Sequence, residues 1–176
     1  MTRPTVETVP GAAPVAGAGP RPDAGLTAVR GELFGAMFVL LQNLSQRADA
    51  ELARFDLTSR QWLLLAVLAT RFGPGVPTLS EAAAAYGTSR QNVKQIACQL
   101  ADRGYLTLEP DAADRRVTRL RLTGRHAVFD EPAVAAEQAA FLAGVFGDLS
   151  PAQTRTLRDL VVRCVDHLRP TRKAQS

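Results

Sequence analysis

The first apolar pattern in the chain is a stripe at helical spacing that begins at Leu26. Apolar side chains recur at steps of three and four residues, which predicts one long helix over about 26–54. A helix of this length projects beyond a small domain, so we expect a second subunit to cover its stripe. The stripe consists of Leu26, Val29, Leu33, Phe34, Met37, Leu40, Leu41, Leu44, Ala48 and Leu52.

Three shorter helices follow, and each begins with the same signature. In a capping box, a hydroxyl residue at the N-cap is followed three positions later by Glu or Gln, and each side chain bonds the other residue's backbone N–H. The second helix is predicted to run through Thr70 and stop at a Gly-Pro-Gly segment, the third to end at Gly87, and the fourth at Gly104. The three matching segments are Thr58-Ser-Arg-Gln61, Thr78-Leu-Ser-Glu81 and Thr88-Ser-Arg-Gln91.

A two-stranded hairpin is predicted directly after the fourth helix. Residues 105–108 and 117–122 form its strands, because the second segment alternates apolar and polar side chains as a half-buried strand does. The polar, turn-rich segment 109–116 connects them. Two short helices joined by a tight turn and followed by a hairpin are typical of a winged helix-turn-helix, which we place at about 57–124.

The chain after the hairpin returns to helical patterns. Residues 123–146 are predicted to be helical with a kink or break at Pro132, and a last helix begins at Ser150-Pro-Ala-Gln153, another capping box. The predicted fold class is therefore mostly α with a small β-hairpin wing. It combines a winged helix-turn-helix with a helical dimerisation region formed by about 26–54 and 124–170.

Both ends of the chain are predicted to be tails. Residues 1–25 are dominated by Pro, Gly, Ala and Thr without apolar periodicity, so they bury too little surface to offset the entropy of ordering. We expect residues 1–25 to be disordered and residues 171–176 to form a short C-terminal tail. No apolar segment of the signal-peptide type follows Arg3, and the longest apolar run is shorter than a membrane span. A cytoplasmic protein without a membrane partner is expected.

The predicted fourth helix has two different faces. Val93, Ile96, Ala97 and Leu100 share one face, which we expect to pack inward. The N-terminal end and the outward side carry side chains that suit base edges in a major groove, because Arg pairs with guanine and Asn or Gln with adenine. The candidate DNA contacts of this helix are Ser89, Arg90, Gln91, Asn92, Lys94 and Gln95. A solvated amphipathic helix is the alternative interpretation.

Basic charge is concentrated in the helix-turn-helix and the hairpin. The whole chain has a formal charge of +4, and residues 88–125 alone carry eight basic and four acidic side chains, which give the same net charge. Asp114, Arg115 and Arg116 lie at the predicted hairpin tip, where an arginine can enter a minor groove. We expect the Asp114 carboxylate to hold one guanidinium by a bidentate contact. A solvated loop with an incidental ion pair is the alternative.

Composition favours a helical binding protein over an enzyme or a metalloprotein. Apolar residues make up 46% of the chain and aromatic residues only 6%, a balance typical of helical proteins. Cys98, Cys164, His126 and His167 are scattered, so they provide neither a metal site nor a nucleophile with its base. We therefore expect no catalytic residue, metal or cofactor, and no disulfide framework.

Five segments between residues 79 and 124 share one family's pattern, and the resemblance as a whole covers roughly residues 27–170. They are Leu79-Ser-Glu, Thr88-Ser-Arg-Gln-Asn-Val-Lys-Gln, Leu100-Ala-Asp-Arg-Gly-Tyr-Leu, Asp111-Ala-Ala-Asp-Arg-Arg-Val and Leu120-Arg-Leu-Thr-Gly. In these segments the chain resembles the MarR family of bacterial transcriptional regulators. The resemblance implies a triangular homodimer held by the first, fifth and sixth helices. Its two recognition helices would enter successive major grooves of a pseudopalindromic operator in double-stranded DNA, with wing arginines in the flanking minor grooves.

The resemblance also assigns roles to individual residues. By position, it implies that the wing pair is Asp114 with Arg116, and that Arg115 is an additional phosphate contact. The chain departs from the family pattern in its longer Pro-rich tail and in Pro132, which falls inside the expected fifth helix. The base-reading candidates that it implies are Arg90, Gln91, Asn92 and Gln95.

Regulation by a small molecule is a further implication of the resemblance. A phenolic or other small aromatic or apolar effector would bind between the dimerisation and DNA-binding regions, although apolar residues at helical spacing also suit an ordinary core. Candidate lining residues are Met37, Phe38, Gln42, Trp62 and His126.

The leading prediction is a homodimeric repressor released by such an effector. One alternative is a winged-helix module for non-specific DNA architecture or protein contact. The other is a regulator that senses oxidants through a cysteine, but Cys98 and Cys164 do not match the first-helix cysteine of the peroxide-sensing family members.

Overall fold

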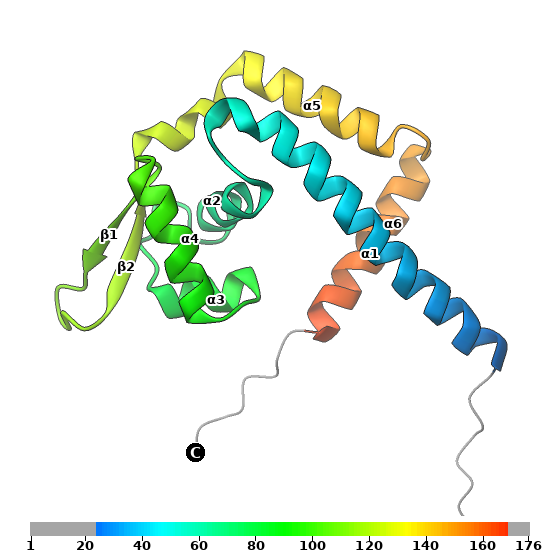
Figure 1. The fold of residues 1–176 in the computed structure, drawn as a ribbon, viewed down its shortest axis with the longest axis horizontal. Coiled ribbons are helices and arrows are strands. Elements are labelled where there is room, and N and C mark those ends of the chain that lie inside the picture. The colour runs from blue at the N-terminus through cyan, green and yellow to red at the C-terminus, as the bar shows by residue number, and fades with distance from the viewer. Residues whose placement is uncertain (1–23, 169–176) are drawn as a thin grey trace, which may run out of the picture. The chain divides into compact units, whose positions relative to one another are not determined.

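The structure is a computed structural model that describes residues 24–168. Of the two predicted tails, residues 1–23 and 171–176 lie outside the described residues, whereas Ala24 and Gly25 already belong to the first helix. The chain divides into two compact units, residues 1–41 and 42–176. Its elements (Figure 1) are α1 (Ala24–Leu52), the 3₁₀ turn η1 (Ala53–Phe55), α2 (Ser59–Phe72), α3 (Leu79–Tyr86), α4 (Arg90–Asp102), β1 (Leu106–Pro110), β2 (Thr118–Leu122), the 3₁₀ segment η2 (Gly124–Asp130), α5 (Pro132–Phe146) and α6 (Pro151–Leu168). The predicted fold class, mostly α with a β-hairpin wing, is confirmed.

The described part of the first unit is the N-terminal stretch of α1, residues 24–41. The predicted long helix is confirmed, and it begins two residues earlier than its apolar stripe. The rings of Phe34 and Phe38 meet edge to face with centroids 4.8 Å apart. The large apolar side chains of this stretch are exposed: Leu26, Val29, Leu33, Phe34, Met37, Phe38, Val39, Leu40 and Leu41.

The core of the second unit lies between α2, α3, α4 and the hairpin (Figure 1). The inward face predicted for α4 is confirmed, because Val93, Ala97 and Leu100 are fully buried and Ile96 is nearly so. Each buried aliphatic side chain of this kind stabilises the fold by about 1.5–3 kcal/mol. The other buried members are Leu52, Leu57, Leu64, Leu65, Leu68, Leu79, Ala82, Ala83, Tyr105, Leu106 and Leu120.

Side-chain hydrogen bonds cap the N-termini of α2, α3 and α6, as the sequence predicts. At α2, Thr58 Oγ1 accepts the N–H of Gln61 and Gln61 Oε1 accepts the N–H of Thr58, and Thr78 and Glu81 repeat the arrangement at α3. At α6, the N–H of Ser150 donates to the Gln153 side chain at 2.8 Å and Ser150 Oγ accepts the N–H of Gln153. These capping boxes satisfy backbone N–H groups that no helical carbonyl can reach.

The capping box predicted at Thr88 is wrong. Ser89 is the N-cap of α4, and its Oγ accepts the N–H of Asn92 at 3.2 Å. Thr88 lies one residue earlier, in the turn, and its Oγ1 accepts a hydrogen bond from the Asn92 side-chain amide at 3.0 Å. Adjacent hydroxyl residues each had a polar residue three positions later, so the pattern alone could not choose between them.

The end of α4 fixes the direction in which the hairpin leaves the helix. Gly104 has φ +74°, a conformation that favours glycine. Its N–H donates to the Ala101 carbonyl at 2.8 Å, and the N–H of Tyr105 donates to the Leu100 carbonyl at 2.9 Å. This is a Schellman ending, so the predicted C′ role of Gly104 is confirmed.

The hairpin strands pair antiparallel, with Leu106 opposite Leu122 and Pro110 opposite Thr118. A third segment supports their base, because the N–H of Leu120 donates to the Pro77 carbonyl at 2.8 Å. The wing is therefore attached to the loop before α3 as well as to the end of α4.

The break predicted at Pro132 is confirmed, but in a different form from a kinked helix. Residues 124–130 form a 3₁₀ segment, Glu131 is extended, and Pro132 occupies the first turn of α5. Proline lacks an N–H and disfavours a helical residue before it, so it suits a helix start. Within residues 24–168, none of the helices has the length and hydrophobicity needed to cross a membrane.

Candidate nucleic-acid interface

The turn between α3 and α4 presents the N-terminal end of α4 to solvent. Gly87 adopts φ +81° and its N–H closes α3 on the Ala83 carbonyl at 2.9 Å. Ser89 then caps α4. The exposed first turn of a helix carries free N–H groups and a partial positive charge, so it favours an anion such as a phosphate.

The outward face of α4 carries four exposed donor side chains: Arg90, Gln91, Lys94 and Gln95. Within residues 24–168, neither Arg90 nor Lys94 forms an ion pair, so both charges are available to a ligand. Asn92 differs from its neighbours because it is half-buried and its amide donates to Thr88. In this structure the Asn92 side chain stabilises the turn before α4, and the Ser89 side chain caps the N-terminus of α4.

A carboxylate that the sequence analysis did not single out organises the wing loop. One Asp111 oxygen accepts the N–H groups of Ala113 and Asp114 at 2.9 and 3.0 Å, and the other pairs with the Arg119 guanidinium. Arg119 also donates to the Val76 carbonyl at 2.8 Å, so the same network reaches the loop before α3. The Arg119 hydrogen bond, followed by those of the two N–H groups, lowers the pKa of Asp111 to about 2.

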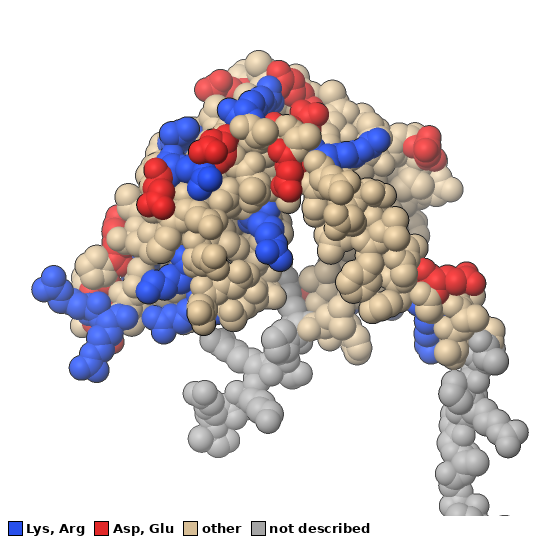
Figure 2. Space-filling view, viewed as in Figure 1, with Lys and Arg blue, Asp and Glu red and all other residues tan. Residues whose placement is uncertain are grey.

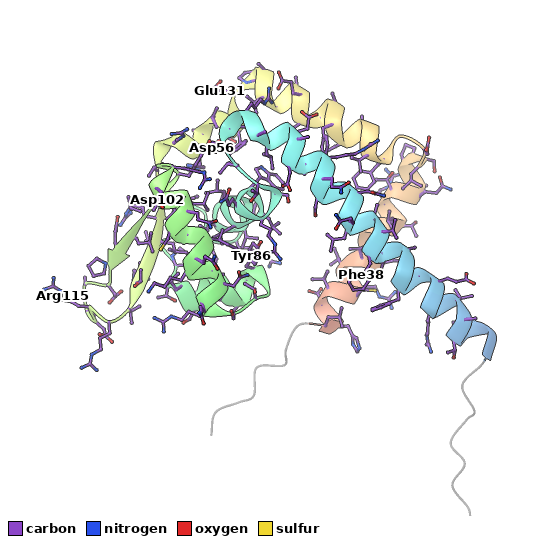
Figure 3. All side chains as sticks on the ribbon, viewed as in Figure 1. Phe38, Asp56, Tyr86, Asp102, Arg115 and Glu131 are labelled. Carbon is purple, nitrogen blue, oxygen red and sulfur yellow. The ribbon has the colours of Figure 1, made fainter. Side chains whose placement is uncertain are left out.

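The predicted contact between Asp114 and an arginine guanidinium is wrong for this structure. Asp114 Oδ1 instead accepts the backbone N–H of Arg116 at 3.0 Å, and the Asp114 carbonyl accepts the N–H of Val117 at 2.9 Å. Asp114 therefore shapes the backbone that carries the arginines. Arg115 and Arg116 are exposed and form no ion pair with any residue in 24–168. Figure 3 shows Arg115 at the free end of the hairpin, pointing away from the core.

Ion pairs and ring contacts divide the eight basic residues of the 88–125 segment into two groups. Arg103 pairs with Asp56, Arg119 with Asp111 and Arg121 with Glu109, while the Arg125 guanidinium lies 4.7 Å from the centre of the Tyr105 ring. The other group, unpaired among the described residues, is Arg90, Lys94, Arg115 and Arg116. In Figure 2, basic side chains project from the end of the unit that carries the hairpin. The sequence showed where charge accumulates, but only the strand register shows which charges are neutralised.

The candidate effector residues are divided between the two units. Met37 and Phe38 belong to the first, in which both are exposed, whereas Gln42, Trp62 and His126 belong to the second. Gln42 is exposed and Trp62 packs half-buried against the core. His126 borders a cavity of about 400 Å³, which is also lined by Ala69, Gly73, Pro74, Gly75, Arg121 and Leu122. The two cysteines, Cys98 on α4 and Cys164 on α6, are free and exposed.

Comparison with known proteins agrees with this geometry. Residues 55–117, from the end of η1 to the wing loop, match the model of the MarR family. This part of the chain is similar to the MarR family. The matched segment contains α2, α3, α4 and the candidate residues of the wing. The matched family consists of transcriptional regulators, which are not enzymes.

Solved structures extend this likeness beyond the matched segment. A mutant of MarR from E. coli complexed with operator DNA has 16% identity and a TM-score of 0.66, over 76% of this chain and 93% of that one. Reduced AbfR bound to DNA has 17% identity and a TM-score of 0.59, over 82% and 96%. A MarR-like protein from Bacillus cereus has 22% identity and a TM-score of 0.64, over 80% and 99%. No curated protein sequence matches the chain.

Proposed function

We propose that this protein is a homodimeric, sequence-specific DNA-binding repressor that a small aromatic or apolar molecule releases from its operator. One observation carries the proposal. Within the basic segment 88–125, the basic residues with neither an ion pair nor a ring contact among residues 24–168 lie on the outward side of α4 and at the wing tip. Unpaired cations release counterions when they meet phosphates, which is the main sequence-independent source of DNA affinity.

The two groups of side chains have separate roles in this proposal. Arg90, Gln91 and Gln95 read base edges in a major groove, where Arg and Gln offer bidentate donors. Lys94 and Arg115 contact phosphates, as do the N–H groups of the α4 first turn beyond Ser89. Arg116 enters the adjacent minor groove on the backbone that Asp114 holds. Two neighbours with this fold are bound to DNA in their structures, which supports a DNA-binding role for this chain.

Exposed apolar surface supports the homodimer. In α6, Leu160 is 50% exposed and Val165 47%, although both belong to a stripe at helical spacing. Within the described residues, α1 and α5 also expose large apolar side chains. A monomer rarely leaves such surface in water, and an isologous contact between two copies would cover it. A two-fold axis then places two copies of α4 about one DNA turn apart.

The effector is proposed to bind in the cavity beside His126. Since the cavity also touches Arg121 and Leu122 at the end of β2, a ligand there would act directly on the base of the wing. Binding would release DNA only if the ligand prefers a conformation that does not fit the operator.

Selection of bound duplexes from a random pool tests the proposal. A regulator of this kind enriches a two-fold-symmetric consensus, and addition of phenolic compounds should then reduce binding to it. A winged-helix module for DNA architecture would enrich no consensus, and a protein-contact module would retain no DNA. A reporter gene behind the selected site separates repression from activation.

A further inference from the structure

The two chain connections that join the winged helix-turn-helix to its flanking helices meet in one cluster of side chains. The first runs from α1 to α2 through η1, and the second runs from β2 to α5 through η2. We call this the corner cluster and define it as Phe55, Asp56, Arg103, Tyr105 and Phe129. None of its members is among the candidate DNA contacts.

Polar contacts attach the first connection to the C-terminal half of α4. Arg103 Nε donates to Asp56 Oδ2 at 3.0 Å, and its terminal nitrogen donates to the Gln99 carbonyl at 3.1 Å. The Gln61 side-chain amide donates to Gln99 Oε1 at 2.9 Å. Gln61 is only 4% exposed and also closes the capping box of α2. The start of α2 and the end of α4 are therefore bonded at neighbouring points.

Tyr105 joins both connections to the same place. Its ring is buried and its hydroxyl donates to the Phe55 carbonyl at 3.0 Å. The Phe129 ring of η2 lies 5.0 Å from the Phe55 ring and 6.4 Å from the Tyr105 ring, centre to centre. A buried tyrosine hydroxyl needs a partner, and aromatic pairs at these distances attract each other. The cluster is thus closed by packing as well as by polar bonds.

Backbone conformation marks the same position. Asp56 has φ +56°, and no other residue in 24–168 apart from glycine has a positive φ. Such a conformation persists where surrounding contacts determine it, and Asp and Asn tolerate it better than most residues. In Figure 3, Asp56 lies close to the end of α1 and near Asp102 at the end of α4.

Contacts on the far side of η1 reach the helix that follows η2. Arg54 forms an ion pair with Glu137 of α5. The N–H of Leu57 donates to the carbonyl of Leu52, the last residue of α1, at 3.2 Å, and both side chains are buried. The corner cluster therefore lies between α4 and the ends of two helices, α1 and α5, that the proposed function places at the dimer interface.

We propose that the corner cluster fixes the angle between α4 and the adjoining ends of α1 and α5. It thereby sets the spacing between half-sites that the dimer accepts. This inference rests on the proposed function and makes Asp56, Arg103 and Tyr105 positioning residues. Helix α4 has 13 residues, so it is about 20 Å long, and a tilt of about 10° at its C-terminal end moves its N-terminal end by about 3.5 Å. That displacement is about one base-pair step along DNA.

The variant that tests the proposal combines two substitutions that remove polar contacts of the corner cluster and leave the size of each side chain nearly unchanged. Asp56→Asn removes the charge but retains a residue that tolerates positive φ, and Tyr105→Phe removes only the hydroxyl. Asp102→Asn is the matched control, because it also removes one negative charge at the end of α4 and Asp102 forms no ion pair with any residue in 24–168. Thermal unfolding shows that each variant is folded before binding is measured.

Binding to three kinds of duplex separates positioning from a general loss of structure. The duplexes are the selected operator, a single half-site at low salt, and operators whose half-sites are moved by one base pair in either direction. For Asp56→Asn/Tyr105→Phe we expect unchanged half-site affinity, about tenfold weaker operator binding, and loss of the preference for the native spacing. An unchanged spacing preference, or equal losses on half-site and operator, would overturn the proposal.

A distance measurement tests the cluster without DNA. Nitroxide labels are placed on Cys98 of α4 and on a cysteine from Arg47→Cys in α1, with Cys164→Ser and an excess of unlabelled chains. We expect a narrow distance distribution for the parent protein and a broader or shifted one for Asp56→Asn/Tyr105→Phe. Identical distributions would overturn the role of the cluster. If the parent protein binds no duplex, the proposed function fails and the spacing proposal fails with it, while the labels still show whether the cluster holds α4.

Discussion

Helices α4 and α6 carry similar apolar stripes but use them differently. In α4, Val93 and Leu100 are 0% exposed, whereas in α6 Leu160 and Val161 are 50% and 41% exposed. Helices α2, α3 and the hairpin cover the first stripe, and no helix among the described residues covers the second to the same degree. Helical periodicity therefore shows that a face is apolar without showing whether the same chain covers it. The α4 stripe completes a core, and the α6 stripe requires a partner under our proposal.

The same substitution in the two stripes should give the largest and most informative contrast. Leu100→Ala leaves a cavity in a closed core, so we expect the free energy of unfolding to fall by about 2–5 kcal/mol at every protein concentration. Denaturant unfolding measures this loss. A loss below about 1 kcal/mol would show that α4 is not anchored as the structure places it.

Leu160→Ala is the counterpart in α6. We expect it to weaken dimerisation by about 1.5–3 kcal/mol, since apolar area is lost from the interface and not from the monomer core. Sedimentation equilibrium measures the dissociation constant, and the variant should dissociate to monomers at higher protein concentrations than the parent protein does. An unchanged association constant would remove α6 from the interface.

Prediction from the sequence was most accurate where short-range chemistry decides the structure. The capping boxes at Thr58, Thr78 and Ser150 and the glycine at Gly104 depend on neighbours within a few residues, and the structure confirms them. The pairing of Asp111 with Arg119 depends on strand register and on a turn, so nothing local in the sequence marks it.

The candidate interface was predictable in its location more than in its detail. The distribution of charge and the order of the motifs indicate α4 and the wing as the interface. However, the Asn92 amide donates to the Thr88 hydroxyl, where a base contact was expected, and the Asp114 carboxylate accepts a backbone N–H, where a guanidinium was expected. A polar side chain next to a turn has local partners that compete with a ligand. The effector residues were the least predictable, because helical spacing does not show which distant segments share a cavity.

Arg116 at the wing tip can be compared with Arg71 on α2, since both are exposed and neither forms an ion pair with any residue in 24–168. We expect Arg116→Ala to weaken operator binding by about 1–3 kcal/mol, because it removes a specific groove contact. Arg71→Ala is the control, since it removes the same charge from an exposed site at the end of α2. Fluorescence anisotropy on the selected duplex measures both. Equal losses would mean that only net charge matters.

Gln91 and Lys94 on α4 sharpen the distinction between base and phosphate contacts. Gln91→Ala should change which base is preferred at one position of each half-site and leave the salt dependence of binding unchanged. Lys94→Ala should weaken all duplexes alike and reduce the slope of log affinity against log salt by about 1. If Gln91→Ala instead weakened all duplexes alike and Lys94→Ala changed the preferred base, the assignments of base and phosphate contacts would be reversed.

Acid should loosen the wing loop, with the smallest effect of the set on global stability. The pKa of Asp111 is lowered to about 2 by Arg119 and two N–H groups, below the value of about 3.9 for a free aspartate. Its stabilising contribution is therefore complete above about pH 4 and is lost as the pH falls through about 2. Amide exchange at Ala113 and Asp114 reports the change. Equal exchange in the parent protein and in Asp111→Asn at pH 5 would contradict it.

A hydroxyl-radical footprint on the selected duplex tests the central claim, that α4 and the wing arginines face one duplex and are repeated by a two-fold axis. We predict protection symmetric about the centre of the site, with outer minor-groove protections that disappear in Arg115→Ala/Arg116→Ala while the inner ones remain. Protection on one side only, or outer protections that survive the double substitution, would contradict the account.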